Sequence, residues 1–369
     1  MFDVVVIGAG IAGLTCAGQL ARGGYRVAIV EKSRGVGGRA ATRRLPGNPT
    51  PSNRADLGVP YLKAEGRLLS GFVRVLRDRG ILTEWTRDLY RWDAENRCAS
   101  PVREPRKPIY VAPEGISAIG KFLATDLEVW CDRRARTLSP GDGGWLIALD
   151  APKNTPDLPF EIAARAIVVA IPAPQAIALL ETREGAFLPL LSNLREIEYD
   201  PCYTVIAGYP QIRQPPWGAI DIPHHPQLRW LGLDSSKRTH PSKPVLVLHS
   251  SPEFARDNLE VKDLEPIGKA LLSTASEMFE LGLERSESEA EFVQVHRWRY
   301  AFPRTGKSQD CLGTLDPFPI VCCGDGFGPS RPQPLETALR SGLAAASLTN
   351  DRLSQFSLPA IEHCWEAIR

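Results

Sequence analysis

The sequence predicts an α/β fold with a parallel sheet, joined to a second, α+β unit built on an antiparallel sheet. Three observations support this prediction. A strand, helix and strand pattern interrupted by glycines opens the chain, further apolar runs occur at residues 166–171 and 319–323, and residues 184–310 combine strand-like pieces with many prolines. With 369 residues, the chain exceeds what one compact core usually holds, which favours two domains.

The first element is an apolar run at residues 2–7 that is rich in β-branched side chains, as in a parallel strand buried on both faces. Residues 8–13 hold three glycines and turn the chain, and residues 14–22 have helical character that a glycine pair ends. Residues 25–31 then read as a second strand. This order is typical of a βαβ unit of about thirty residues.

Each glycine of the turn has its own physical task. Gly8 permits the tight turn, Gly10 lets the backbone approach a pyrophosphate, and Gly13 allows helix and strand to pack closely. Phosphates are favoured by the free N–H groups at the start of the helix. Glu31 ends the second strand, where a carboxylate can accept hydrogen bonds from a ribose. A purely structural turn does not require an acid in this register, so the stretch predicts a dinucleotide site.

Later segments complete this unit and connect it to the second one. A surface loop is expected at residues 45–53, an amphipathic helix at 68–79, and a charged, proline-containing connection between domains at 98–107. A strand, a helix, a strand, a hairpin and a buried strand are expected, in this order, at residues 109–111, 114–119, 127–131, 136–149 and 166–171.

The composition changes at residue 184 and changes back near residue 311. Strands are expected at residues 201–206 and 244–248, and a helix at 264–281. The chain then returns to the first unit with a buried strand that ends in Gly324 and Asp325, followed by a helix at residues 335–348. We therefore predict a discontinuous first domain, residues 1–61, 108–183 and 311–369, and a second domain, residues 62–107 and 184–310.

A second glycine-rich stretch begins at Glu31. Its sequence at residues 31–39, Glu-Lys-Ser-Arg-Gly-Val-Gly-Gly-Arg, resembles the amine-oxidase-like FAD superfamily. The resemblance implies a Rossmann-type FAD-binding domain in which Gly37, Gly38 and Arg39 contact FAD; a guanidinium fork suits the pyrophosphate. It also implies that Asp325 binds a ribityl hydroxyl and that the next helix points its N-terminus at the flavin. The alternatives are a solvated basic loop and an ordinary Gly-Asp turn.

Further segments in matching order narrow the resemblance to bacterial renalase-type FAD oxidoreductases. Trp298-Arg299-Tyr300 belongs to the most specific of these segments, which lie at residues 55–61, 110–117, 168–175, 297–301 and 341–346. Two features depart from the family: Pro60 replaces a polar residue, and the turn at residues 326–334 is less smooth. Both positions lie near the flavin in the family fold.

The expected site residues fall into two groups. Cofactor contacts are assigned to Gly8, Gly10, Ile11, Ala12, Gly13, Glu31, Lys32, Gly37, Gly38, Arg39, Ala135, Gly324 and Asp325. Catalytic candidates are Trp298, Arg299, Tyr300 and Tyr61, placed over the flavin where they could stack on a planar substrate. Since strand residues alternate faces, the other interpretation puts Trp298 and Tyr300 in the core and Arg299 in solvent.

Composition argues against several other classes of function. Lys and Arg total 44 and Asp and Glu 43, so no global field gathers nucleic acid. No run reaches the roughly 18 apolar residues of a membrane span, and Asp3 argues against a secretory signal, so we expect a cytoplasmic protein without integral membrane association. Cys322-Cys323 is expected in the core and His224-His225 in an exposed loop, and no metal site is predicted.

The expected chemistry is hydride transfer from a small organic donor to non-covalently bound FAD, with reoxidation by oxygen or another acceptor. Three hypotheses remain open. The resemblance implies reduced nicotinamide, NAD(P)H or its isomers, as the donor. The second is an amine or another CH donor, and the third, prompted by Pro60, is a redox-sensing or interaction flavoprotein without efficient turnover. The sequence has no second Gly-x-Gly-x-x-Gly unit for a docked NAD(P) domain and predicts no oligomeric state.

Overall fold

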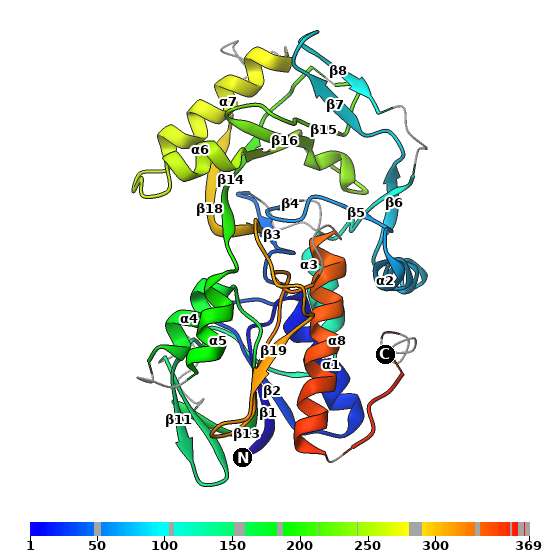
Figure 1. Ribbon diagram of the computed structural model, residues 1–369. Helices are drawn as coiled ribbons and strands as arrows, with labels where there is room; N and C mark the ends of the chain where they lie inside the picture. The colour runs from blue at the N-terminus through cyan, green and yellow to red at the C-terminus, as the bar shows by residue number, and fades with distance from the viewer. Residues whose placement is uncertain are drawn as a thin grey trace.

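The computed structural model describes residues 1–47, 53–102, 107–150, 159–182, 187–213, 215–241, 243–279, 290–328, 333–354, 356–360 and 365. Figure 1 shows two halves stacked along the long axis of the molecule, with the N-terminus in the lower half. The lower half contains a mostly parallel sheet and the upper half a mostly antiparallel one, which confirms the predicted fold class.

The lower sheet is centred on β1 (Phe2–Ile7), which pairs in parallel with β2 (Val27–Val30) and β13 (Glu161–Val169). The second half of β13 pairs with β20 (Ile320–Cys322), while its first half pairs with the expected hairpin, β12 (Gly144–Leu149). The other strands of this sheet are β10 (Glu128–Trp130), β11 (Ala135–Gly141) and β19 (Leu312–Thr314).

Helices cover both faces of the lower sheet because the side chains of β1 alternate between two cores. Val4 and Val6 pack toward α1 (Ile11–Gly23) and α8 (Pro334–Leu353), and Val5 and Ile7 pack toward the opposite face. The first face also carries α2 (Arg67–Asp78) and α3 (Ser117–Leu123), and the second carries α4 (Ala173–Leu180) and α5 (Leu188–Arg195).

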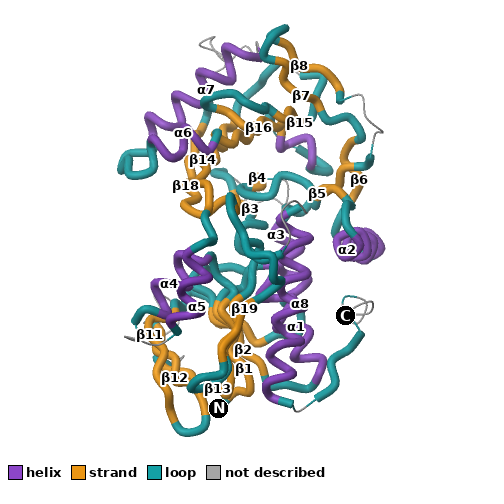
Figure 2. Tube along the Cα trace, viewed as in Figure 1, coloured by secondary structure: helices purple, strands orange, loops and turns teal. Residues whose placement is uncertain are grey.

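In Figure 2, α8 runs beside α1. The two helices approach closely at Gly342, where an added Cβ would lie 2.4 Å from the Ala12 carbonyl oxygen. The contact brings the segment after β20 against the glycine turn.

The upper sheet has seven strands, and α6 (Pro252–Asp257) and α7 (Glu265–Phe279) pack on its outer face. In spatial order the strands are β18 (Phe292–Pro303), β14 (Tyr199–Gly208), β17 (Val245–Ser250), β16 (Leu228–Leu233), β15 (Ala219–Asp221), β7 (Tyr90–Asp93) and β8 (Cys98–Pro101). Its inner face packs on the segment that contains Ala55 and Leu57.

Two small sheets lie between the halves (Figure 1). One pairs β3 (Thr42–Arg44) with β4 (Arg54–Asp56), and the other joins β5 (Leu62–Lys63), β9 (Ile109–Val111) and β6 (Thr83–Thr86). A short 3₁₀ helix, η1 (Asp234–Lys237), follows β16.

One sequence expectation is wrong. Residues 98–101 do not form part of a connection between domains, because β8 pairs with β7 as the edge strand of the upper sheet. An edge position tolerates Pro101, which cannot donate to a ladder, and the turn is held by Asp93, whose carboxylate accepts from the amides of Glu95 and Asn96. Residues 103–106 lie outside the described part of the chain.

Candidate cofactor and substrate site

The glycine turn between β1 and α1 is built from backbone alone. Gly8 has a φ of +108°, and an added Cβ would lie 2.6 Å from the Ala170 carbonyl oxygen; at Gly13 it would lie 2.1 Å from the carbonyl oxygen of Gly8. Gly10 differs, because its Cβ would meet nothing within 4 Å. The outer side of the turn at Gly10 therefore has room for a ligand to approach the backbone.

The start of α1 is suited to phosphate. No side chain caps the helix at Gly10, so no capping side chain takes up the first free amides of α1. Free N–H groups and the helix dipole together favour an anion there.

Glu31 lies at the carboxyl end of β2, next to this turn, and its side chain is buried. One carboxylate oxygen accepts from the Ala9 amide at 2.8 Å and the other from the Ser33 amide at 2.7 Å. Each oxygen keeps a further acceptor site, which a ribose hydroxyl could occupy. Lys32 turns outward, and its Nζ donates to Gln175 at 3.2 Å.

The second glycine stretch packs on the first. The Gly37 amide donates to the Ala9 carbonyl at 2.8 Å, and an added Cβ at Gly38 would lie 3.1 Å from the Gly10 Cα. Gly37 and Gly38 both have positive φ, at 107° and 59°. The two loops thus form one cradle of bare main chain, which a side chain at these positions would fill.

Arg39 and Asp325 meet at the edge of the cradle. The guanidinium donates to Asp325 Oδ1 at 2.7 Å and to the Ala301 carbonyl at 3.0 Å. The Tyr199 hydroxyl lies 3.5 Å from the same carboxylate, and burial with this negative charge raises the pKa of its phenol. The Gly324 amide donates to Ser341 Oγ of α8 at 2.9 Å, which fixes the end of β20 against that helix.

Four side chains form a line across the inner face of the upper sheet, and we call them the facing row: Trp230, His249, Thr204 and His296. Thr204 Oγ1 donates to the Leu57 carbonyl at 2.9 Å and accepts from Trp298 Nε1 at 3.1 Å. The row therefore lies against the segment that follows β4, at Leu57.

Both histidines of the facing row are neutral near pH 7. Burial, together with the charges of Lys237 and Arg229, lowers the pKa of His249 to about 3. Burial and the charge of Arg43 lower the pKa of His296 to about 4. The row is thus a polar but uncharged surface.

Three of the four catalytic candidates lie on the side of the upper sheet that faces the cradle, and Arg299 lies on the other side. Trp298 packs on His296 with ring centroids 4.3 Å apart, and the Tyr300 carbonyl lies 3.4 Å from Arg39. Tyr61 is half-buried in the core that Trp298 also joins. Arg299 does not join them, because it forms an exposed bidentate pair with Glu260, at 2.6 and 3.1 Å.

Other expected residues lie at varying distance from the cradle. Ala135 begins β11, two positions after Arg133, whose amide donates to the Glu31 carbonyl at 2.8 Å. Cys322 and Cys323 are buried free thiols, and burial raises the pKa of both. Of the 326–334 turn, residues 329–332 lie outside the described chain.

Several residues of the site have no motif in the sequence. Tyr199, Thr204, His249 and His296 reach it only through strand pairing in the upper sheet. His225 lies outside this site and closes a loop, where its Nδ1 accepts from the amides of Gln227 and Leu228.

No group of metal ligands occurs among the described residues, and no helix there is both long and apolar enough to cross a membrane.

Solved structures share this fold across nearly the whole chain. A chain from Exiguobacterium sp. 255-15, assigned as a protoporphyrinogen oxidase, superposes with a TM-score of 0.68 at 14% identity and covers 96% of this chain and 99% of its own. Putrescine oxidase and the cyclohexylamine oxidase of Brevibacterium oxydans IH-35A each give a TM-score of 0.64 at 14% identity, covering 96% of this chain and 99% and 100% of theirs. At such identity the likeness shows the fold alone.

Curated relatives match over short stretches. An L-amino-acid oxidase of Siganus canaliculatus is 40% identical over 73 residues, which are 20% of this chain and 13% of the relative. The lysine-specific histone demethylase 1 homolog 1 of Arabidopsis thaliana is 45% identical over 60 residues, 16% of this chain and 7% of the relative. The chain thus matches only a small part of the length of these relatives.

Two families match along the chain. Residues 6–76 match an NAD(P)-binding Rossmann-like domain, and residues 99–349 match the flavin containing amine oxidoreductases. The bare cradle, the uncapped start of α1 and the acceptor sites of Glu31 fit an adenine dinucleotide, and FAD is the cofactor. The chain belongs to the flavin containing amine oxidoreductase family.

Proposed function

We propose that the protein transfers a hydride from a small organic donor to FAD, and that the donor is a reduced nicotinamide, NAD(P)H or one of its isomers, as in renalase-type oxidoreductases. The proposal is supported chiefly by two arginines, Arg43 and Arg229, beside the uncharged facing row. Their charges help to lower the pKa of His296 and His249, respectively.

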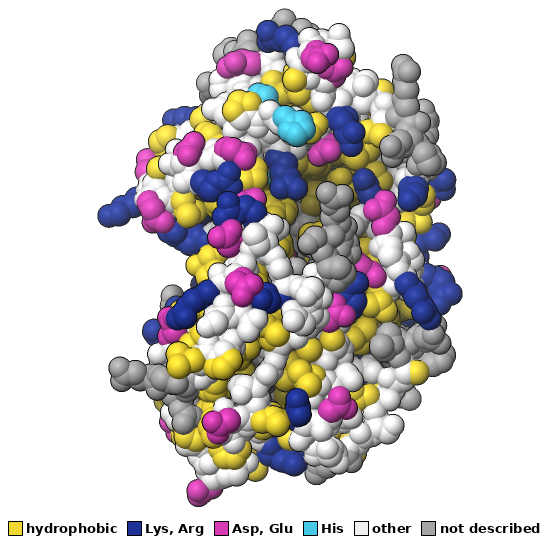
Figure 3. Space-filling view, in the orientation of Figure 1, with side chains coloured by type: hydrophobic (Ala, Val, Ile, Leu, Met, Phe, Trp, Pro, Cys, Tyr) yellow, Lys and Arg dark blue, Asp and Glu magenta, His cyan; other side chains and the backbone are white. Residues whose placement is uncertain are grey.

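Neither arginine has an ion-pair partner within the described ranges, although Arg229 packs on the Phe302 ring at 4.3 Å. In Figure 3, Lys and Arg side chains lie on both sides of the waist between the halves, with acidic side chains among them. Cations without a protein partner favour a donor that carries phosphate groups. A cationic amine gains nothing from them.

The residues of the chain would hold and orient the reactants. Glu31 and the two glycine loops would bind the nucleotide part of FAD, and Arg39 with Asp325 would hold the part between the phosphates and the ring. FAD supplies the electron sink when bound. Trp298 would give a flat face for a nicotinamide ring, and the neutral histidines would keep positive charge away from it.

Hydride release from a dihydronicotinamide requires no base, because the ring becomes an aromatic cation without losing a proton. The facing row offers no group that titrates near neutral pH, which agrees with this chemistry.

An amine donor is the second candidate. It is favoured by the fold shared with putrescine oxidase and cyclohexylamine oxidase, and by Asp221 and Glu65, whose charges help to raise the pKa of the Tyr61 phenol and could attract an ammonium group.

Anaerobic reduction of the bound flavin tests the proposal. The purified protein is mixed with NADH, NADPH, their isomers, putrescine or cyclohexylamine, and the visible absorbance of oxidised flavin is followed. Bleaching by reduced nicotinamides supports the proposal. Bleaching by amines alone overturns the choice of donor, and no bleaching by any donor favours a binding protein without turnover.

Arg229→Gln tests the role assigned to the cation. We expect the NADPH concentration for half-maximal bleaching to rise about tenfold, equivalent to about 1.4 kcal/mol, because a charge-assisted contact to phosphate is lost. Arg299→Gln is the matched control, since it removes an exposed arginine from the outer face of the same sheet. Equal effects of the two substitutions would contradict the proposal.

A further inference from the structure

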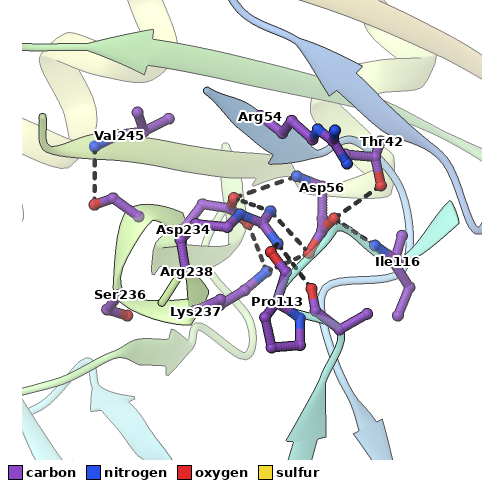
Figure 4. Close-up of polar contacts among 12 residues, drawn as sticks. Thr42, Arg54, Asp56, Pro113, Ile116, Asp234, Ser236, Lys237, Arg238 and Val245 are labelled. Carbon is purple, nitrogen blue, oxygen red and sulfur yellow. Dashed lines mark hydrogen bonds and ion pairs between the residues drawn. The ribbon is translucent and has the colours of Figure 1, made fainter. Parts of the chain in front are cut away.

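A cluster of four charged side chains lies where the upper half meets β4, and we call it the buried quartet: Asp56, Asp234, Lys237 and Arg238 (Figure 4). Every one of these side chains is at most 1% exposed. Asp56 belongs to β4, whereas the other three come from η1 and the residue after it.

The contacts within the quartet are close. Lys237 Nζ lies 2.6 Å from Asp234 and 3.3 Å from Asp56, and the Arg238 guanidinium lies 2.6 Å and 3.2 Å from the same two carboxylates. Each acid thus contacts both bases. The cluster holds two negative and two positive charges, so it is neutral as a unit.

Aromatic rings and a carbonyl surround the two bases. Lys237 Nζ lies 5.6 Å from the Trp85 ring centroid and 5.7 Å from that of Trp230. Arg238 also donates to the Ala112 carbonyl at 2.9 Å. These contacts tie η1 and Arg238 to β6, to β16 and to the segment that follows β9.

Stability alone is a poor explanation for such a cluster. The desolvation of buried ions offsets much of their attraction, and well-packed apolar side chains are often as stabilising. What a buried ion cluster adds is one definite arrangement, since a shifted arrangement leaves charges without partners.

Hydrogen bonds connect Asp56 and the residues after it to the segment that begins at Arg39. Asp56 Oδ1 accepts from Thr42 Oγ1 at 3.1 Å, across the β3 and β4 pair (Figure 4). One residue on, the Leu57 amide donates to the Ala41 carbonyl at 2.8 Å, and the Val59 amide donates to the Arg39 carbonyl at 3.1 Å.

Gly58 makes this path rigid. An added Cβ there would lie 1.9 Å from the Arg39 carbonyl oxygen, so the main chains of Gly58 and Arg39 touch without an intervening side chain. These contacts connect the segment that begins at Asp56 to the main chain of Arg39.

We propose that the buried quartet positions Arg39 for FAD: Asp56, held by Lys237 and Arg238 of the upper half, fixes the backbone from which the guanidinium reaches Asp325. This inference rests on the assignment of Arg39 to the cofactor cradle. The quartet residues are positioning residues. Through them, the upper half of the molecule is connected to Arg39 at the edge of the cofactor cradle.

The test uses a charge-balanced double substitution, Asp56→Asn with Lys237→Met, in the full-length holoprotein. It leaves Asp234 and Arg238 as a neutral pair, so the urea midpoint of the FAD-free protein should stay close to that of the parent. FAD release, followed by the return of flavin fluorescence, should accelerate about tenfold, as expected when a coupling network between two sites is broken. A structural role alone would leave the release rate unchanged.

Thr42→Val is the gentler companion, because it removes one contact to Asp56 without changing a charge. We expect FAD release to accelerate about threefold. It also decides the question if the double variant does not fold.

Asp3→Asn is the matched control. It removes a partly buried carboxylate that contacts Arg165 and the Arg26 amide at the amino end of β1, far along the strand from the cradle. Its FAD release should equal that of the parent.

Arg39→Gln separates the possible failures. If Arg39→Gln accelerates FAD release while Thr42→Val and the double variant do not, the inference is overturned and the cradle assignment stands. If Arg39→Gln has no effect, Arg39 is not a cofactor contact and the inference falls with that assignment. The identity of the donor is decided separately, by flavin bleaching.

Discussion

The cofactor cradle and the facing row are built in opposite ways. The cradle consists of main chain, with Gly8, Gly10 and Gly37 placing carbonyls and amides against one another and Glu31 joining them through two short hydrogen bonds. The facing row consists of side chains that four strands bring into line.

This difference explains how each region can vary. A cradle of bare main chain admits almost no substitution, because any added atom meets backbone or ligand. The row can change its side chains without changing the fold, so it is the region where donor specificity is expected to diverge within the family. Substitutions in the two regions should therefore affect different measurements.

The largest effect is expected from a pair of alanine substitutions in the cradle. Gly13→Ala places a methyl group 2.1 Å from a carbonyl oxygen, so we expect a loss of stability at the upper end of the roughly 1–3 kcal/mol typical of overpacking, together with loss of FAD binding. Gly10→Ala meets no protein atom, and its φ of −74° suits any residue. It should keep the urea midpoint of the FAD-free protein and weaken FAD binding about 100-fold, or about 2.7 kcal/mol.

Urea denaturation and FAD titration measure the two effects. If Gly10→Ala binds FAD as tightly as the parent, the open side of the turn is not where the pyrophosphate lies. The cradle would then be a structural turn, which is the alternative that the sequence left open.

The cradle could be predicted from the sequence because its chemistry is local. Gly8, Gly13 and Glu31 lie within one βαβ unit, and short-range sterics fix their roles. The fold class followed for the same reason, since apolar strands and glycine turns are local signals.

The facing row could not be predicted, because its members are separated by long stretches of chain and meet only through register. Thr204 pairs with His249 on one side and with His296 on the other. The alternation of side chains along β18 did allow one part of the row's surroundings to be predicted, namely the interpretation that places Arg299 in solvent. The quartet was hidden similarly, since Asp56 and Lys237 are joined only by the docking of η1 on β4.

Trp298 lies beside the facing row, in contact with Thr204 and His296. A smaller effect is expected from Trp298→Phe, which tests whether this face of the upper sheet acts on the donor rather than on FAD. The substitution removes the hydrogen bond to Thr204 Oγ1 and keeps an aromatic ring. We expect the rate of anaerobic flavin reduction to fall about fivefold, or about 1 kcal/mol, with unchanged FAD release. Arg299→Gln, at the next position but on the outer face, should change neither. A slower reduction in both variants, or faster FAD release in Trp298→Phe, would remove the distinction between the two regions.

The effect that is smallest near neutral pH is a pH dependence of stability that comes from the facing row, because it develops only as the pH falls below 6.5. Unfolded histidine has a pKa near 6.5, whereas the folded values are about 3 for His249 and about 4 for His296 because both rings are buried beside positive charge. Below pH 6.5 the unfolded chain therefore binds protons that the folded chain does not, and stability falls as the pH drops toward 4. Each histidine contributes up to about 1.4 kcal/mol per pH unit in that window. His249→Gln should reduce this slope in urea denaturation, whatever its effect on stability near neutral pH. An unaltered slope in His249→Gln would mean that this histidine is protonated in the folded protein, and the row would then carry a charge that repels the nicotinamide cation left after hydride transfer.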